Sequence, residues 1–129
     1  MRTEPAPDIK EMVSDIVKTL ELKHVDLDRI YCVKSYKSKT NAVARIWSMP
    51  KIWRSVLNMK PAYVIEVISE KFYKLSKKEQ YKVLIHELIH IPKRFSGGLV
   101  QHKNKYINFY YQERKLFKEF LKKKSMNLL

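Results

Sequence analysis

The chain has 129 residues, 45% of them hydrophobic and 12% aromatic, which suffices for one hydrophobic core but not for a second domain. The single cysteine, Cys32, excludes an intramolecular disulfide and a multi-cysteine zinc site, and we expect it to be a small buried side chain rather than a nucleophile. A reducing compartment is indicated, and because the polar amino terminus has no apolar core and no run of about 18 apolar residues occurs, we expect a cytoplasmic protein without a membrane span.

The charge is strongly positive, since 27 basic and 13 acidic residues give a net charge of +14. Nucleic acid is therefore a candidate partner. The lysines are scattered through every segment, however, so a solvated basic surface is at least as good an interpretation. Residues 115–124, where Lys alternates with Leu and Phe, could suit an anionic membrane or nucleic acid, but a solvated helix face is the favoured interpretation.

Helical and strand patterns alternate along the first half of the chain. Residues 8–23 carry apolar residues at helical spacing behind the capping-box pair Asp8 and Glu11, and they predict an amphipathic helix. Two short runs rich in β-branched and aromatic residues, 30–33 and 43–47, predict strands. The turn residues between these runs suggest that the two strands form a hairpin.

The middle of the chain is less clear. Pro50 and Pro61 bracket a segment whose apolar spacing allows either a short helix or an irregular packed stretch. Residues 63–68 form the clearest strand, because Val, Ile and Tyr dominate them. Trp47 and Trp53 are expected to anchor the core beside the strands, with the lining of a cleft as the alternative.

Two further helices are predicted in the second half. Ser76 and Glu79 form a capping box ahead of a helix over 77–91, which stops at Pro92. The last helix is predicted over 102–124, with an apolar face formed by Tyr106, Phe109, Tyr110, Phe117, Phe120 and Leu121.

The order of these elements separates three strands from the helices, which is typical of the α+β class. We predict a small three-stranded, mostly antiparallel sheet packed with the N-terminal helix, the helix over 77–91 and the C-terminal helix. Residues 1–129 are expected to form a single domain with flexible ends at 1–7 and 125–129.

The helix over 77–91 contains an HExxH motif, His86 to His90. Residues four apart lie on the same face of a helix, so both imidazoles can bind one ion, and zinc suits neutral imidazole. Glu87 is offset by about 100° around the helix, close enough to a metal-coordinated water to act as the general base. The ordinary alternative is that both histidines lie in the core and form hydrogen bonds within the protein. The helix around them is largely apolar, however, so these polar groups would be buried at a high cost in free energy unless a metal paired with them. Catalytic metal binding is therefore predicted.

The third ligand is open. His102 is the leading candidate, because the turn around Gly97 and Gly98 lets the chain fold back, and a solvent-facing histidine at the start of the last helix is the alternative. Glu113 and Glu119 are the rivals, since many zinc hydrolases with this motif take a glutamate ligand from the following helix.

Other polar aromatic and histidine side chains are weaker candidates. Tyr106 and Tyr110 lie one and two turns beyond His102 and can donate a hydrogen bond to a developing oxyanion, although core packing is the favoured interpretation. His24 lies far away in sequence and is expected to be structural or exposed.

The stretch from Tyr63 to Tyr106 resembles a family of metallopeptidases found in phages and archaea and, more loosely, the SprT-like zincins. The resemblance extends loosely back through residues 42–53 and covers over half of the chain. The residues that carry it are Pro61, the strand 63–68, the motif and its continuation 86–92, and then Phe95, Ser96, Gly97, Gly98 and His102.

This resemblance implies a zincin-like fold in which His86, His90 and His102 bind zinc and Glu87 is the catalytic base. It also makes the strand 63–68 a candidate edge strand, against which a peptide substrate would pair backbone to backbone. SprT-like zincins suggest DNA-associated proteolysis, which the basic charge fits, but the chain lacks the cysteine-rich zinc element that some of them carry.

The sequence thus predicts a zinc-dependent metallohydrolase, and more specifically a metallopeptidase that cleaves peptide bonds by Glu-assisted attack of zinc-bound water. Its partner would be a peptide or protein substrate. Three alternatives stay open: a basic nucleic-acid-associated module with a structural metal, a DNA-associated protease of the SprT-like type, and a metallohydrolase that acts on a non-peptide amide or a cell-wall fragment. The oligomeric state is open as well.

Overall fold

A four-stranded mixed sheet forms one layer of the structure, a computed structural model that describes residues 1–127. The strands lie side by side in the order β1 (Arg2–Pro5), β2 (Ile30–Tyr36), β4 (Tyr63–Ile68) and β3 (Ala44–Ser48). β2 and β4 run parallel, whereas β1 pairs antiparallel with β2, and β3 pairs antiparallel with β4. β1 and β3 are therefore the two edge strands.

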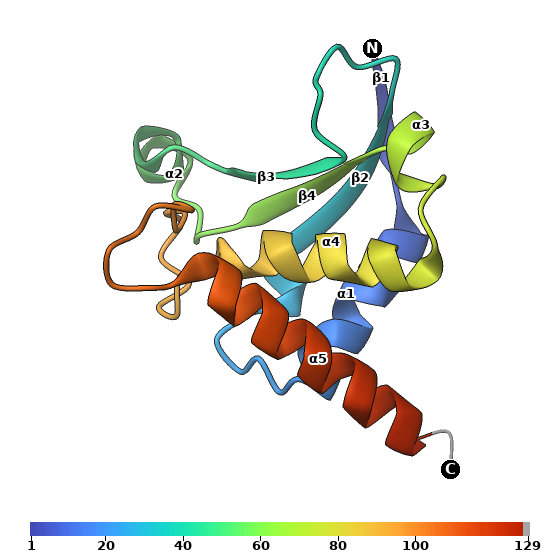
Figure 1. Ribbon diagram of the computed structural model, residues 1–129. Helices are drawn as coiled ribbons and strands as arrows, with labels where there is room; N and C mark the ends of the chain where they lie inside the picture. The colour runs from blue at the N-terminus through green and yellow to red at the C-terminus, as the bar shows by residue number, and fades with distance from the viewer. Residues whose placement is uncertain (128–129) are drawn as a thin grey trace.

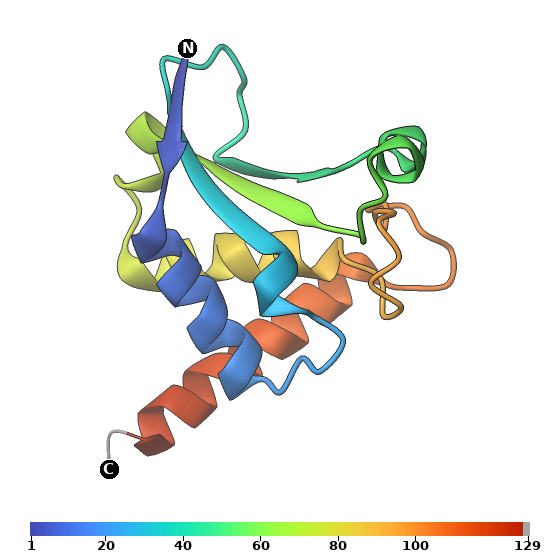
Figure 2. The ribbon, with the colours of Figure 1, turned by 180° about the vertical axis from the view of Figure 1, so that it is seen from behind.

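Helices form the second layer. Three of them, α1 (Pro7–Thr19), α4 (Lys77–Ile89) and α5 (Phe109–Asn127), lie on the same side of the sheet (Figure 1, Figure 2). The two shorter helices, α2 (Lys51–Leu57) and α3 (Ser69–Phe72), lie at opposite ends of the sheet. None of the helices within residues 1–127 is long and apolar enough to cross a bilayer. The predicted α+β class is confirmed.

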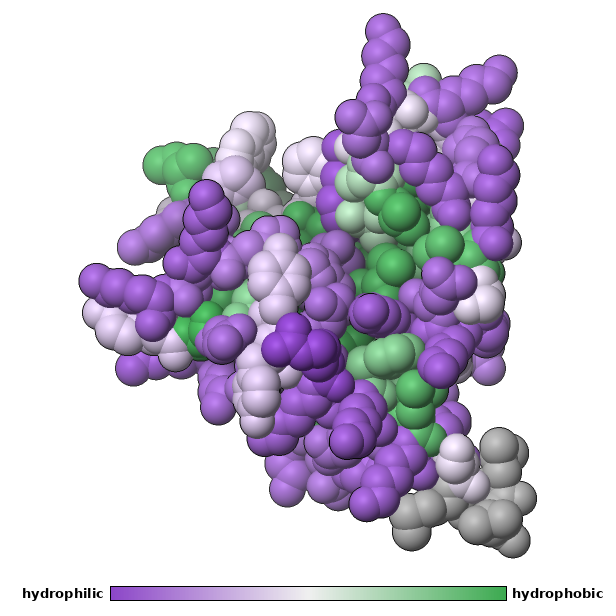
Figure 3. All heavy atoms as spheres, in the orientation of Figure 1, coloured by the Kyte–Doolittle hydropathy of each residue, from purple (hydrophilic) through white to green (hydrophobic). Residues whose placement is uncertain are grey.

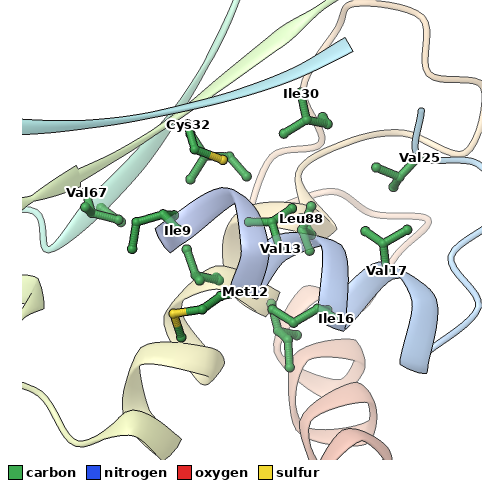
Figure 4. Packing of buried hydrophobic residues seen from close by; sticks show 14 of the residues in the cluster. Ile9, Met12, Val13, Ile16, Val17, Val25, Ile30, Cys32, Val67 and Leu88 are labelled. Carbon is green, nitrogen blue, oxygen red and sulfur yellow. The ribbon is translucent and has the colours of Figure 1, made fainter. Parts of the chain in front are cut away.

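The core lies between the sheet and the three long helices. α1 contributes one apolar stripe at helical spacing, made of Ile9, Met12, Val13, Ile16 and Val17. Figure 4 shows how this stripe meets Cys32 and Val67 from the sheet and Leu88 from α4. Burying each such side chain stabilises the fold by about 1.5–3 kcal/mol. Cys32 is buried, as predicted, and burial raises the pKa of its thiol to about 11.

The sheet differs from the prediction in its number of strands, in their pairing and in the place of residues 63–68. It has four strands rather than three, and it is mixed: two of its three strand pairs are antiparallel, as predicted, and the central pair is parallel. The predicted hairpin of β2 and β3 does not form, because β4 lies between them. The expected edge strand 63–68 is β4, which is central. β4 is buried along almost its whole length. A buried strand needs a neighbouring strand on each edge to satisfy its backbone hydrogen bonds, and it carries apolar side chains on both faces, so these residues favour a central position.

The first residues of the chain differ from the prediction as well. Residues 1–7 were expected to be flexible, but Arg2–Pro5 form β1 along β2. The capping box of Asp8 and Glu11 was also wrong: Ala6 is the N-cap, and Pro7, whose missing N–H suits the first helical turn, begins α1. The Asp8 carboxylate instead accepts a hydrogen bond from the Tyr73 hydroxyl at 2.7 Å.

The last helix begins later than predicted. α5 starts at Phe109, because the Asn108 side chain accepts a hydrogen bond from Tyr111 N at 3.1 Å and residues 101–108 form a loop. Tyr106 therefore lies in that loop and is 84% exposed, not packed in the core. Of the expected flexible end 125–129, residues 125–127 belong to α5, and residues 128 and 129 lie outside the described residues.

The segment between Pro50 and Pro61 contains the short helix α2, which is one of the two structures predicted for it. Trp47 and Trp53 do not anchor the core, since half or more of each side chain is exposed. The indole N–H of Trp47 donates a hydrogen bond to the Glu66 carboxylate at 2.8 Å on the face of the sheet that the long helices leave free. A short 3-10 turn over Leu27–Arg29 leads into β2.

Candidate metal centre

α4 carries His86 and Glu87, and His90 follows directly as its C-cap. The hydroxyl of Ser76 starts the helix by accepting a hydrogen bond from Glu79 N at 3.2 Å, and it donates one to the Glu79 carboxylate at 3.0 Å. The predicted cap is confirmed. The rings of His86 and His90 project from the same face of the chain, with centroids 5.2 Å apart.

His102 reaches the same point from the loop after α4. Val100 N donates a hydrogen bond to His90 O at 2.7 Å, and this bond turns the chain back toward α4. His102 Nε2 then lies 3.0 Å from His86 Nε2, and one ring nitrogen from each of His86, His90 and His102 lies within 4.8 Å of the others. We call these three residues the histidine cluster. The structure thus brings together the three histidines that the sequence singled out.

Tyr63 holds the loop that allows this return. Its hydroxyl accepts a hydrogen bond from Gly97 N and donates one to Gly98 O, both at 2.8 Å. Gly97 has a φ of +93°, a conformation that side-chain-bearing residues rarely adopt. The glycine pair beside the motif is therefore fixed to the central strand of the sheet.

The Nδ1 atoms of His86 and His90 face hydrogen-bond acceptors. His90 Nδ1 lies 2.6 Å from the Val100 carbonyl oxygen, and His86 Nδ1 lies 3.1 Å from Glu113 Oε1. Because a carbonyl and an ionised carboxylate can only accept, each ring carries its proton on Nδ1 and keeps a lone pair on Nε2. This is the tautomer that a histidine needs in order to bind a metal through Nε2.

Burial keeps the two rings on α4 neutral. It lowers the pKa of His90, and it lowers the pKa of His86 even though the Glu113 carboxylate opposes the shift. Neutral imidazole is the form that ligates divalent metals such as zinc. His86 and His90 can therefore bind a divalent ion without first losing a proton.

Glu87 lies on the same helix and is only 6% exposed. Burial raises the pKa of its carboxyl group to about 8, and the negative charge of Glu113 adds to the shift. A carboxyl group with a pKa near neutrality can both accept and return a proton at physiological pH.

A cleft of about 270 Å³ opens beside these groups. Its lining combines polar residues with apolar ones: Lys82, His86, Glu87 and Glu113, and Val43, Ala44 and Val83. The cleft lies between α4 and the start of β3, so a molecule bound there would meet both Glu87 and the edge of the sheet.

β3 presents an unpaired edge next to this cleft. Ile68 N donates a hydrogen bond to Val43 O at 2.9 Å, and in the register of the pair these two residues lie directly opposite each other. Because bonded and non-bonded pairs alternate in an antiparallel ladder, the backbone groups of Ala44, Ile46 and Ser48 point away from β4. An added strand can pair with these three residues.

The two rival ligands of the sequence analysis do not join the cluster. Glu113 contacts His86 on the nitrogen opposite to the one that faces His102. Glu119 forms an ion pair with Lys123 at 3.2 Å on the exposed side of α5. His24 is half-buried and is not part of the cluster found among residues 1–127.

The aromatic residues near the cluster differ from the expectation. Phe109, at the start of α5, packs against all three imidazoles with centroid distances of 4.6–4.8 Å and is almost completely buried. Tyr110 stacks on His102 at 5.8 Å and is half-exposed. Sequence reasoning treated Phe109 only as part of an apolar face. Phe109 precedes Glu113 by four residues, so both side chains lie on the same face of α5. This spacing is the sequence signal that could have indicated that both lie over the cluster.

A comparison with protein families adds one finding. The model of a family described as "Putative phage metallopeptidase" matches residues 1–122. The chain belongs to this family. Membership in the phage metallopeptidase family confirms the resemblance seen in the sequence and indicates a metal-dependent peptidase, for which the three histidines can hold the ion. No curated protein and no solved structure matched the chain. The looser likeness to SprT-like zincins stays a prediction.

Proposed function

We propose that this member of the phage metallopeptidase family is a zinc-dependent peptidase with a zincin-like active site. The observation that carries the proposal is the convergence of His86, His90 and His102 beside the buried carboxyl group of Glu87. These are the residue types of a catalytic zinc site, in which three protein ligands leave one position free.

The three histidines of the cluster would hold the ion. Nε2 of His86 and His90 each carries a lone pair, because Nδ1 is engaged by Glu113 or by the Val100 carbonyl. His102 Nε2 already lies beside His86 Nε2, so an ion would replace a contact between two ring nitrogens rather than require a new arrangement of the chain.

A bound zinc ion supplies Lewis-acid chemistry, which polarises a carbonyl group and acidifies water. Glu87 would take a proton from the attacking water and return it to the leaving amine. Glu87 lies on α4 one residue after His86, and both side chains line the same cleft. The burial of Glu87 supports this role, because the carboxylate is the less stable form of a buried group and accepts a proton readily.

The free edge of β3 would orient the substrate. Ala44 lies both on this edge and in the wall of the cleft, together with His86 and Glu87. A peptide that adds to the edge as a fifth strand would therefore bring its backbone carbonyl groups to the catalytic residues. Strand addition depends on backbone groups, so it suits a peptide better than a non-peptide amide.

Replacement of Glu87 by glutamine tests the proposal. Wild-type protein loaded with zinc should cleave members of a degenerate peptide library, with cut sites read by mass spectrometry, and a chelator should stop the cleavage. The Glu87→Gln variant should keep its zinc but lose at least about 100-fold in rate, because the amide cannot accept the proton. Glu119→Gln, the same change on the exposed side of α5, is the control and should cleave like the wild type. Undiminished cleavage by Glu87→Gln would contradict the proposed role.

A further inference from the structure

Helix α2 exposes an apolar surface that the fold does not use. Of its seven residues none is buried, and four large side chains on it are more than half exposed: Ile52 (69%), Trp53 (59%), Val56 (73%) and Leu57 (52%). We call these four residues the α2 apolar face. Figure 3 shows hydrophobic side chains standing out at this end of the molecule. A patch of large apolar side chains that no element within residues 1–127 covers indicates a binding surface.

α2 contacts the loop beside the metal centre through its other side. Arg54, on the opposite side of the helix, packs against Gly97, whose loop Tyr63 fixes to the sheet. Asn58 adopts the left-handed conformation and ends the helix, and Met59 N donates a hydrogen bond back to Arg54 O at 2.9 Å. The α2 apolar face therefore lies on a helix with a defined carboxyl end and a contact to the Gly97 loop.

The α2 apolar face continues the free edge of β3. Only Met49 and Pro50 separate the end of β3 from the start of α2, and both ribbon views place α2 beyond that end of the strand (Figure 1, Figure 2). Antiparallel pairing is the more stable kind. A peptide paired antiparallel with β3, with its scissile bond near Ala44, would run past Ser48 toward its own amino terminus and reach α2. At about 3.3 Å per residue, α2 would meet residues about five to eight positions before the scissile bond.

The residues around the path of such a peptide are positively charged and favour an acidic partner. Residues 29–65, which include β2, β3 and α2, contain eight Lys or Arg and no Asp or Glu, and residues 88–112 contain four Lys or Arg and no Asp or Glu. Lys51 begins α2, Lys60 follows its end by three residues, and both are exposed. A second copy of this chain would bring the same positive charge to the interface and be repelled, whereas an acidic partner would be attracted.

We propose that the α2 apolar face docks the substrate segment that precedes the scissile bond, and that this segment combines bulky apolar side chains with acidic neighbours. The inference rests on the proposed peptidase function and adds a substrate class to it. Apolar contacts with Ile52 and Val56 bind the segment, and the surrounding lysines favour acidic peptides over basic ones.

The test compares cleavage of a degenerate 16-residue peptide library by three forms of the zinc-loaded protein. The wild type should prefer Leu, Ile, Phe or Met several-fold about five to eight positions before the cut, with Asp or Glu nearby. The double variant Ile52→Ser and Val56→Ser should lose this upstream preference and keep the preference next to the cut. Both side chains are largely exposed, so the variant is expected to fold. Tyr31→Ser, which removes another half-exposed large side chain on β2, is the control and should leave the profile unchanged.

Each other outcome overturns the inference, and the outcomes separate it from the proposed function. Cleavage without an upstream preference, or with the preference after the cut, contradicts docking on α2 while the peptidase function stands. An upstream preference that is retained in the double variant also contradicts docking on α2 while the peptidase function stands. No cleavage by the wild type contradicts the peptidase function and the inference together. Sedimentation with anionic phosphatidylserine vesicles that is lost in the double variant, while its cleavage profile is that of the wild type, would identify the face as a membrane contact instead.

Discussion

Each ring nitrogen of His86 has its own partner, Glu113 at Nδ1 and His102 at Nε2. At the scale of residues, this arrangement makes His102 a proposed metal ligand and Glu113 a group that positions the His86 ring. Sequence reasoning found His102, because a lone histidine beyond a glycine turn is a conspicuous signal. It placed Glu113 among the rival ligands, because the sequence cannot tell which nitrogen of a ring a carboxylate approaches.

Glu113 should therefore affect zinc affinity less than a ligand does. Glu113→Gln keeps a hydrogen-bonding group beside His86 and should weaken zinc binding about 10- to 100-fold, the usual effect of changing such a partner. His102→Ala removes a proposed ligand and should weaken it more. Competition with a chromogenic chelator measures both dissociation constants. Equal losses in the two variants would mean that Glu113 is itself a ligand.

The role of Gly97 follows from its backbone conformation. An alanine methyl group at this position would lie 2.8 Å from Arg54 Cζ, and φ is +93°. Gly97→Ala should destabilise the protein by about 1–3 kcal/mol in urea unfolding. Gly98→Ala is the matched control, because its nearest neighbour would be Ser96 Oγ at 3.8 Å, and it should change stability little. Equal effects of the two substitutions would show that the Gly97 conformation is not a constraint.

At the scale of elements, the local patterns predicted most helices and strands but not how the strands pair. The run of Val and Ile in 63–68 marked a strand, and Ser76 marked the start of α4. The parallel pairing of β2 with β4 joins residues such as Cys32 and Ile65, which are far apart in the chain. No local turn signal encodes such a contact, whereas the loop between β2 and β3 looked like that of a hairpin.

Glu66 fastens the edge strand β3 to β4. Its carboxylate accepts hydrogen bonds from Arg45 Nε at 2.5 Å and Trp47 Nε1 at 2.8 Å, and from Ser35 Oγ on β2. Burial by itself raises the pKa of Glu66, but the hydrogen bonds from Arg45, Ser35 and Trp47 outweigh it and hold the pKa below the usual 4.5. These contacts keep in place the strand that we propose to receive the substrate.

This network predicts an acid-sensitive sheet. The unfolded chain takes up the Glu66 proton at higher pH than the folded protein does, so the stability that the carboxylate contributes is present above about pH 4.5 and is lost as the pH falls through the lowered folded-state pKa. Glu66→Gln should be less stable at pH 7 and should show a flatter loss of stability below pH 4.5 in urea unfolding. Glu119→Gln, in an exposed ion pair, should follow the wild type. A wild-type slope in Glu66→Gln would contradict this account.

At the scale of the whole molecule, the composition predicted one core, and we propose that residues 1–129 form a single domain. α5 contacts both α4 and α1. Phe120 on α5 is 1% exposed and packs on the ring of Tyr81 from α4 at 4.8 Å. The exposed α2 apolar face was not predicted, because large apolar residues near strands were expected to be buried.

A single domain should unfold in one step. Thermal unfolding followed by far-ultraviolet circular dichroism and by calorimetry should give one coincident transition. Phe120→Ala should lower the stability of that whole transition by about 3–5 kcal/mol, because it leaves a cavity between α4 and α5. Two transitions, of which the substitution shifts only one, would show that α5 is an independent unit.

The central claim is that His86, His90 and His102 together hold a catalytic zinc ion beside Glu87. X-ray absorption at the zinc edge tests it most directly, because multiple scattering counts the imidazole ligands. The wild-type protein should bind one zinc ion with three imidazoles, and His102→Ala should show two. A wild-type site with two imidazoles and a carboxylate, or a protein that takes up no zinc, would contradict the claim.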